Sequence, residues 1–181
     1  FRLHKNADKL AKDFYPERFV KSRIRSNGNT NASDILRAPD GQAVTLGNRG
    51  SITVNTNRNG KLVVDGDGED FCLATLNMQN GTRYRISVSQ NDDDADFEEL
   101  GTSNGRNNCF DLSDADVAWA NYIKIEDRSS DGTLSSTSID AICLLHLGGL
   151  VENTAELSTA TQLLVESTST IVVNFTDIFE S

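Results

Sequence analysis

Apolar and polar residues alternate along much of the chain with the two-residue period of a β-strand. Residues 84–89 (YRISVS) are the clearest case, because Tyr84, Ile86 and Val88 fall on one side and polar residues on the other. Successive side chains of a strand point to opposite faces, so one face of this strand is predicted to be buried and the other solvated. Similar short apolar stretches, separated by turn-forming residues, occur at 44–55, 61–64, 71–76, 109–112, 120–126 and 139–147. Many short strands of this kind predict an all-β sandwich or barrel.

The two ends of the chain follow other patterns. Residues 6–15 (NADKLAKDFY) have apolar positions at helical spacing before Pro16, which predicts a short N-terminal helical arm. Residues 152–166 are loosely helical, and residues 169–179 (STIVVNFTDIF) predict a final strand. Such a late strand either returns to its own sheet or pairs with the edge of another chain. We therefore expect three segments: an arm at 1–33, a β-sandwich at 34–149, and a C-terminal extension at 150–181 that ends in a strand.

The chain is strongly acidic. Its 181 residues include 17 Lys and Arg against 27 Asp and Glu, a formal net charge of −10. This charge opposes binding to nucleic acid or anionic lipid. No apolar run approaches the roughly 20 residues that a membrane helix needs, so membrane insertion is not expected. The chain opens on Phe1 without a signal segment, and we expect a mature extracellular protein.

Three cysteines and three N-glycosylation sequons are relevant to the expected extracellular location. No C-x-x-C pair is present, which excludes the ordinary zinc and redox motifs. In a secreted chain we expect one disulfide and one odd thiol, with three pairings open; in a cytosolic chain all three would be small buried residues. The candidates are Cys72, Cys109 and Cys143 for disulfides, and Asn31, Asn80 and Asn174 for N-glycosylation.

Four carboxylates crowd the glycine-spaced turn within residues 61–76: Asp65, Asp67, Glu69 and Asp70. Like charges this close repel unless a cation, a basic group or water screens them. Oxygen ligands on a flexible turn suit a hard cation, so we predict calcium as a cofactor here. Two acids that flank later strands are further candidate ligands, Asp127 and Asp140. The alternative is a solvated acidic hairpin tip.

Residue types for catalysis are sparse. His4 lies in the predicted arm and His146 in an apolar strand, and no serine or cysteine occurs in a recognisable nucleophile motif. We therefore expect no enzymatic activity. For glycan binding, an exposed aromatic side chain beside polar groups is the expected mark. Trp119 is the candidate ligand-binding residue, and its alternative role is a core anchor at the start of a strand.

The order of several short motifs resembles galactose-binding-like jelly-roll β-sandwich domains of bacterial surface and secreted proteins. The resemblance covers residues 34–147, and its motifs include APDG at 38–41, GSITV at 50–54, FDL at 110–112, YIKI at 122–125 and SIDAI at 138–142. It implies a two-sheet jelly roll, non-catalytic binding or scaffolding, and a structural calcium. The strand at 71–77 lacks the acidic residue that such domains usually carry near its end, and the cysteines are outside the pattern.

Two functions remain at this point. The basic N-terminal arm and the late strand lead us to expect an extracellular structural protein that self-associates into a filament or surface layer, with strand exchange between subunits as one route. The alternative is a carbohydrate-binding, adhesive module whose partners are glycans.

Overall fold

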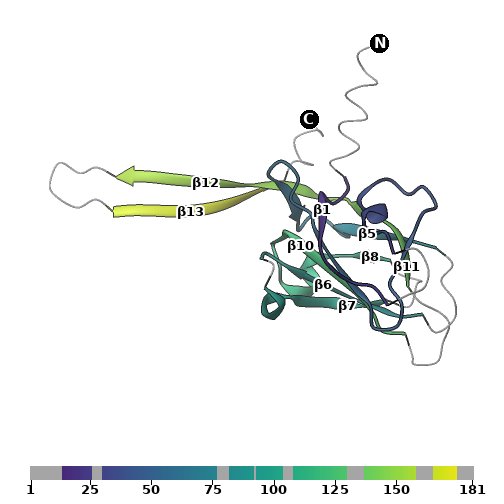
Figure 1. The fold of residues 1–181 in the computed structure, drawn as a ribbon. Helices are drawn as coiled ribbons and strands as arrows, with labels where there is room; N and C mark the ends of the chain where they lie inside the picture. The colour runs from purple at the N-terminus through teal and green to yellow at the C-terminus, as the bar shows by residue number, and fades with distance from the viewer. Residues whose placement is uncertain are drawn as a thin grey trace, which may run out of the picture.

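The molecule is a β-sandwich with a long β-hairpin that projects from one end (Figure 1). The computed structural model describes residues 14–25, 30–76, 82–91, 93–103, 108–129, 137–157 and 165–174. All strand pairs among these residues are antiparallel. The predicted all-β jelly-roll-type sandwich is confirmed.

One face of the sandwich is a five-stranded sheet. Its strands, in spatial order, are β1 (Arg18–Arg23), β3 (Ser51–Asn55), β10 (Tyr122–Asp127), β6 (Tyr84–Ser89) and β7 (Glu98–Ser103). Strand β10 buries every second residue, as its alternating sequence predicts. In β6, by contrast, Ser87 and Ser89 are buried although their face was predicted to be solvated. Ser87 lies between Lys124 and Glu99 on the two neighbouring strands, and such long side chains cover a small one.

The opposite layer contains two four-stranded sheets. The first is β2 (Val44–Thr45), β11 (Ser138–Leu144), β5 (Phe71–Thr75) and β8 (Cys109–Phe110). The second is β13 (Val165–Asn174), β12 (Leu147–Leu157), β4 (Lys61–Val64) and β9 (Trp119–Ala120). The described residues also form three short 3-10 helices: η1 (Ala32–Leu36), η2 (Asp94–Asp96) and η3 (Leu112–Ala115).

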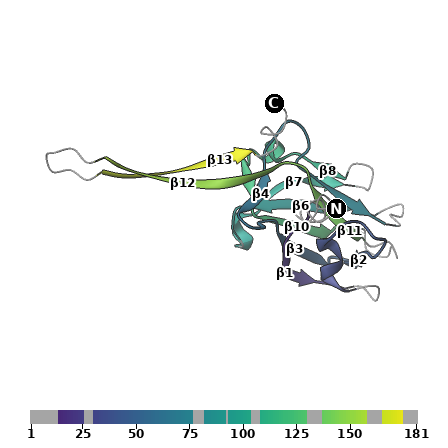
Figure 2. The same cartoon turned by 90° about the horizontal axis from the view of Figure 1, so that it is seen from above.

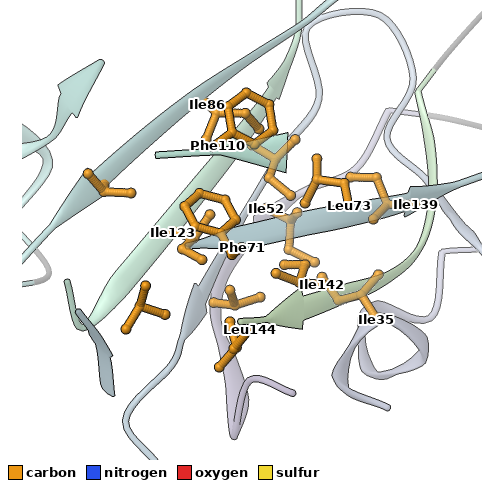
Figure 3. Packing of buried hydrophobic residues seen from close by; sticks show 14 of the residues in the cluster. Ile35, Ile52, Phe71, Leu73, Ile86, Phe110, Ile123, Ile139, Ile142 and Leu144 are labelled. Carbon is orange, nitrogen blue, oxygen red and sulfur yellow. The ribbon is translucent and has the colours of Figure 1, made fainter. Parts of the chain in front are cut away.

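The hydrophobic core fills the space between the five-stranded sheet and the β2-β11-β5-β8 sheet (Figure 3). Ile52, Ile86 and Ile123 enter it from the first sheet, and Phe71 and Leu73 enter it from β5. The rings of Phe71 and Phe110 stack with centroids 5.5 Å apart. Truncating one of these fully buried side chains to Ala typically costs about 2–5 kcal/mol.

Both ends of the chain differ from the sequence expectation. The predicted N-terminal helix lies mostly outside the described residues, and Phe14 and Tyr15 lie in a turn. The basic stretch that follows is not a free arm, because it forms edge strand β1 on β3. Glu17 also donates its backbone N–H to Asn55.

The prediction of a helical stretch at 152–166 is wrong for residues 152–157 and 165–166, which lie in strands, and residues 158–164 lie outside the described part of the chain. Strand β12 runs to Leu157 and pairs residue by residue with β13, so that hairpin pairing overrides the weak helical spacing. The late strand thus pairs with its own chain, and Figures 1 and 2 show the two strands projecting together. The expected boundary at 149/150 falls inside β12, which begins at Leu147. The first residues of this strand, including Gly148 and Gly149, pair with β4, so the hairpin continues a strand of the sandwich.

Candidate functional site

The acidic turn between β4 and β5 is organised around the buried carboxylate of Asp70. One of its oxygens, Oδ1, accepts the backbone N–H of Gly66 at 2.9 Å and lies 2.7 Å from Nδ1 of His146. The other oxygen, Oδ2, accepts the backbone N–H of Leu112 at 2.7 Å. The ring of His146 packs so closely on Gly66 that a Cβ at this position would overlap it. Asp70 therefore holds together three segments that are distant in the sequence.

The electrostatics of this turn reflect burial and crowding. Burial raises the pKa of Asp70 above its ordinary value, and the Leu112 N–H, His146 and the Gly66 N–H partly offset this by lowering it. The pKa of Asp65 is also raised, first by partial burial and then by repulsion from Asp70 and Asp111. The Asp70 carboxyl group is thus held by hydrogen bonds within the protein, while Asp65 and Asp111 lie close to it.

Only part of the predicted calcium set comes together. Ligand oxygens of Asp65, Asp70 and Asp111 lie within 4.8 Å of one another, whereas Asp67 and Glu69 are exposed and outside this group. Calcium takes six to eight oxygens, and both oxygens of Asp70 already accept hydrogen bonds. The three residues therefore supply a partial shell, and calcium binding here stays a prediction.

The other two predicted ligands lie elsewhere in the sandwich. Asp127, at the end of β10, accepts backbone N–H groups of Ser129 and Thr137, both at 2.8 Å. Asp140 accepts the backbone N–H groups of Asp40 at 3.2 Å and Gly41 at 3.0 Å. Both carboxylates are buried. They fasten loops to the sheets and do not meet the acidic turn.

Two grooves are candidate binding sites. The larger, which we call the loop groove, has a volume of about 520 Å³ and lies between the β6–β7 loop and the segment that leads into β9. Its polar lining consists of Ser89, Gln90, Asn91, Asp96, Glu98 and Asp116. Val88, Ala95, Val117 and Ala118 form the apolar part of the lining. Sequence reasoning did not identify these residues as a site.

Local hydrogen bonds shape the loop groove. Asn91 donates from Nδ2 to Asp96 at 2.6 Å, and its Oδ1 accepts the backbone N–H of Asp93. Asp116 ends η3 in the left-handed region, with φ of 55°, a conformation that Asp and Asn tolerate better than most residues. Two lysines near the loop, Lys21 and Lys124, pair with Asp94, which lies outside the groove lining.

The second groove, which we call the edge groove, measures about 450 Å³ and lies between the edge strands β7 and β8. Its lining is Arg83, Leu100, Gly101, Thr102, Ser103, Cys109, Phe110 and Asp114. Asp114 and Asp116 are both exposed and two residues apart, yet they line different grooves.

The remaining predicted site residues are placed as follows. Trp119 is half-buried and pairs with Val64, so it adjoins the loop groove through Ala118 without lining it. Asn31 caps η1 and donates from Nδ2 to Asp34. Asn80 lies outside the described residues, and Asn174 ends β13. A disulfide joins Cys72 to Cys109, and Cys143 is a free thiol.

Comparisons with known proteins bear on the fold. No protein-family model matches the chain, and no curated protein is significantly similar to it in sequence. Chitosan-binding module 1 of a chitosanase/glucanase from Paenibacillus sp. IK-5 is similar in structure, with a TM-score of 0.51 and 16% identity over 74% of this chain and 98% of that one. The fold is a galactose-binding-like β-sandwich. The C-terminal domain of a chitobiase from Bacteroides fragilis is also similar, with a TM-score of 0.50 and 14% identity over 75% and 95% of the two chains.

These likenesses overturn the expected filament or surface-layer subunit. The similar structures include a carbohydrate-binding module, which favours the alternative function. Part of the structural motivation for subunit assembly is also lost, because the late strand pairs with β12 of the same chain. In the described part of the chain, no helix has the length and apolar character required to cross a membrane.

Proposed function

We propose that this chain is a non-catalytic carbohydrate-binding module of an extracellular protein, and that the loop groove is its glycan site. The observation that carries the proposal is the likeness to a chitosan-binding module over 98% of that module's length. The disulfide between Cys72 and Cys109 supports an oxidising, extracellular compartment.

The chemistry of the loop groove supports glycan recognition. Sugar hydroxyls are both donors and acceptors, and the groove offers the exposed amide of Gln90 together with the second N–H of the Asn91 amide, whose other groups bond to Asp93 and Asp96. Val117 and Ala118 add apolar surface for the carbon skeleton of a sugar ring. A small number of polar groups on a partly apolar wall is the usual composition of a small-molecule site.

The charge of the groove favours an amino sugar. Three carboxylates line it, Asp96, Glu98 and Asp116, and none of its ten lining residues is basic or aromatic. Without an aromatic ring, the stacking that often binds neutral sugars is not supplied by the lining. Hydrogen bonds from a charged donor to a carboxylate are then the strongest contacts that the groove offers. Glucosamine units, which carry a protonated amine, match this lining better than N-acetylated or acidic units.

A calorimetric comparison of two matched oligosaccharides tests this proposal. Oligomers of glucosamine and of N-acetylglucosamine share a skeleton and differ in the charge of one group. At mildly acidic pH, where the amine is protonated and most carboxylates are ionised, we expect the glucosamine oligomer to bind more tightly. D116N should weaken this binding by roughly tenfold to a hundredfold, since a hydrogen bond to a charged group contributes about 1.5–3 kcal/mol.

The chain itself supplies a matched control. D114N removes the same charge two residues away but from the edge groove, so it should leave the affinity unchanged. Loss of binding in D114N but not in D116N would move the site to the edge groove. The absence of binding to either oligomer and to a broad glycan array would contradict the proposed function.

A further inference from the structure

The three cysteines lie side by side across one sheet. In the register of the strands, Cys72 of β5 is directly opposite Cys109 of β8 on one side and Cys143 of β11 on the other. Residues directly opposite one another on antiparallel strands project from the same face of the sheet. Phe71 and Leu73 point into the core, so the row of cysteines lies on the other face.

The backbone geometry explains which pair forms the disulfide. Leu73 donates its N–H to the carbonyl of Asn108 at 2.8 Å, which makes 73 and 108 a hydrogen-bonded pair. Pairs alternate along an antiparallel ladder, so Cys72 and Cys109 form a non-hydrogen-bonded pair, the type whose Cα atoms lie closer together. Their Cα atoms are 4.0 Å apart.

On the other side of β5 the geometry also permits a bond. The backbone N–H and C=O groups of Cys72 point away from β8 and therefore toward β11. Cys72 and Cys143 thus form the hydrogen-bonded type of pair, in which the Cα atoms are further apart. The Cα separation of that type, about 5.5 Å, is within the usual range for a disulfide. We propose that Cys72 has two alternative disulfide partners, and that the thiol of Cys143 exchanges with the Cys72–Cys109 bond.

The exchange is balanced without an external oxidant. The thiolate Sγ of Cys143 attacks Sγ of Cys72 and forms a new S–S bond. The bond between Cys72 and Cys109 breaks, its electron pair leaves on Sγ of Cys109, and that sulfur takes up the proton that Cys143 lost. One disulfide and one thiol are present before and after.

The exchange changes which strands are linked. The existing bond ties β5 to edge strand β8, whereas the alternative bond ties β5 to β11 and leaves β8 held by its hydrogen bonds. Cys109 lines the edge groove beside Phe110 and Asp114, so the released thiol lies at that groove.

The surroundings of Cys143 slow its attack on the existing disulfide. Burial and then the charge of Asp140 raise the pKa of its thiol, which leaves little thiolate for attack at neutral pH. Tyr15, from the segment before β1, is close enough that its own pKa is raised by burial and by Cys143. The exchange is therefore slow compared with that of an exposed thiol.

Three variants test the proposal by intact mass and non-reducing peptide mapping after treatment with oxidised glutathione. C143S forms the existing disulfide and is the positive control. C109S should also lose two hydrogens and yield a peptide in which Cys72 is joined to Cys143. C72S should keep both thiols, because Cys109 and Cys143 lie two strand spacings apart, about 10 Å. A folded C109S that fails to form a disulfide where C143S succeeds would overturn the proposal.

The wild-type protein gives a second readout if C109S does not fold. After prolonged incubation, the folded protein is quenched in acid, unfolded and labelled at its free thiol. We expect the label on both Cys143 and Cys109, in unequal amounts. Label on Cys143 alone at every time of incubation would contradict the exchange.

Discussion

Among single residues, Asp70 contributes most to the geometry around the acidic turn. Its carboxylate has no solvent exposure and binds two backbone N–H groups and the ring of His146. Removing the carboxylate would leave these buried donors unpaired, and each such group costs about 1–3 kcal/mol. The raised pKa shows that burial outweighs the hydrogen bonds in setting the ionisation of this group.

We predict that an NMR titration of the Asp70 carboxyl will give a pKa above that of an ordinary aspartate. H146Q should raise this pKa further, because His146 is one of the groups that lower it. Since the folded pKa lies above the unfolded one, the stabilisation linked to Asp70 is present at acid pH and is lost as the pH rises through the folded pKa. An Asp70 pKa at or below the ordinary value would contradict this account.

The residue types indicated which side chains carry oxygen ligands or acceptors, but they did not indicate which group each side chain binds. Asp127 and Asp140 were expected to bind a metal ion, yet both accept backbone N–H groups of nearby loops. A carboxylate oxygen can bind a metal ion, and it can also accept a hydrogen bond from a backbone N–H group. Which one it meets depends on loops that approach only in the folded chain, such as residues 40 and 41 beside Asp140.

Among the elements, the β4–β5 turn is where a calcium ion is still predicted. Asp65, Asp70 and Asp111 are the acidic group in question, and repulsion from the other two carboxylates helps to raise the pKa of Asp65. We expect added calcium to raise the melting temperature of a chelator-treated sample. At a calcium concentration 100 times Kd the gain in stability is about 2.7 kcal/mol.

The same turn contains the control for this prediction. D65N should abolish the calcium effect, whereas D67N, an exposed residue outside the acidic group, should preserve it. A melting temperature that is independent of calcium in the native protein would show that the Asp70 hydrogen bonds and the disulfide suffice to hold the turn.

Strands with strict alternation were predictable from the sequence, and the final hairpin was not. Strand β10 has the expected period of two, with Ile123 and Ile125 buried. Leu157, the last residue of β12, is followed in the sequence by Ala160 and Leu164 at spacings that suit a helix, and the pairing of β12 with β13 decides the outcome for the residues of the strand. A local pattern does not reveal a pairing partner that begins eight residues later, at Val165.

At the scale of the whole molecule, the loop groove forms because segments around residues 90–98 and 116–118 meet at one end of the sandwich. Strand β10 connects them: Tyr122 pairs with Ser89, and Asn121 bonds to the backbone of Ser89 and Gln90. The sequence pointed to Trp119, which only adjoins the groove, because an aromatic residue is the most visible signal of sugar binding. Amides and carboxylates dispersed along the chain give no such signal until folding brings them together.

NMR chemical-shift perturbation by a bound glucosamine oligomer would locate the glycan site on the protein residue by residue. We predict that the largest shifts will occur at Gln90, Asn91, Asp96, Asp116 and Ala118, and that they will decrease in the D116N variant. Shifts confined to the edge groove around Thr102 and Asp114, or an unperturbed spectrum at saturating oligomer, would contradict the assignment of the loop groove as the glycan site.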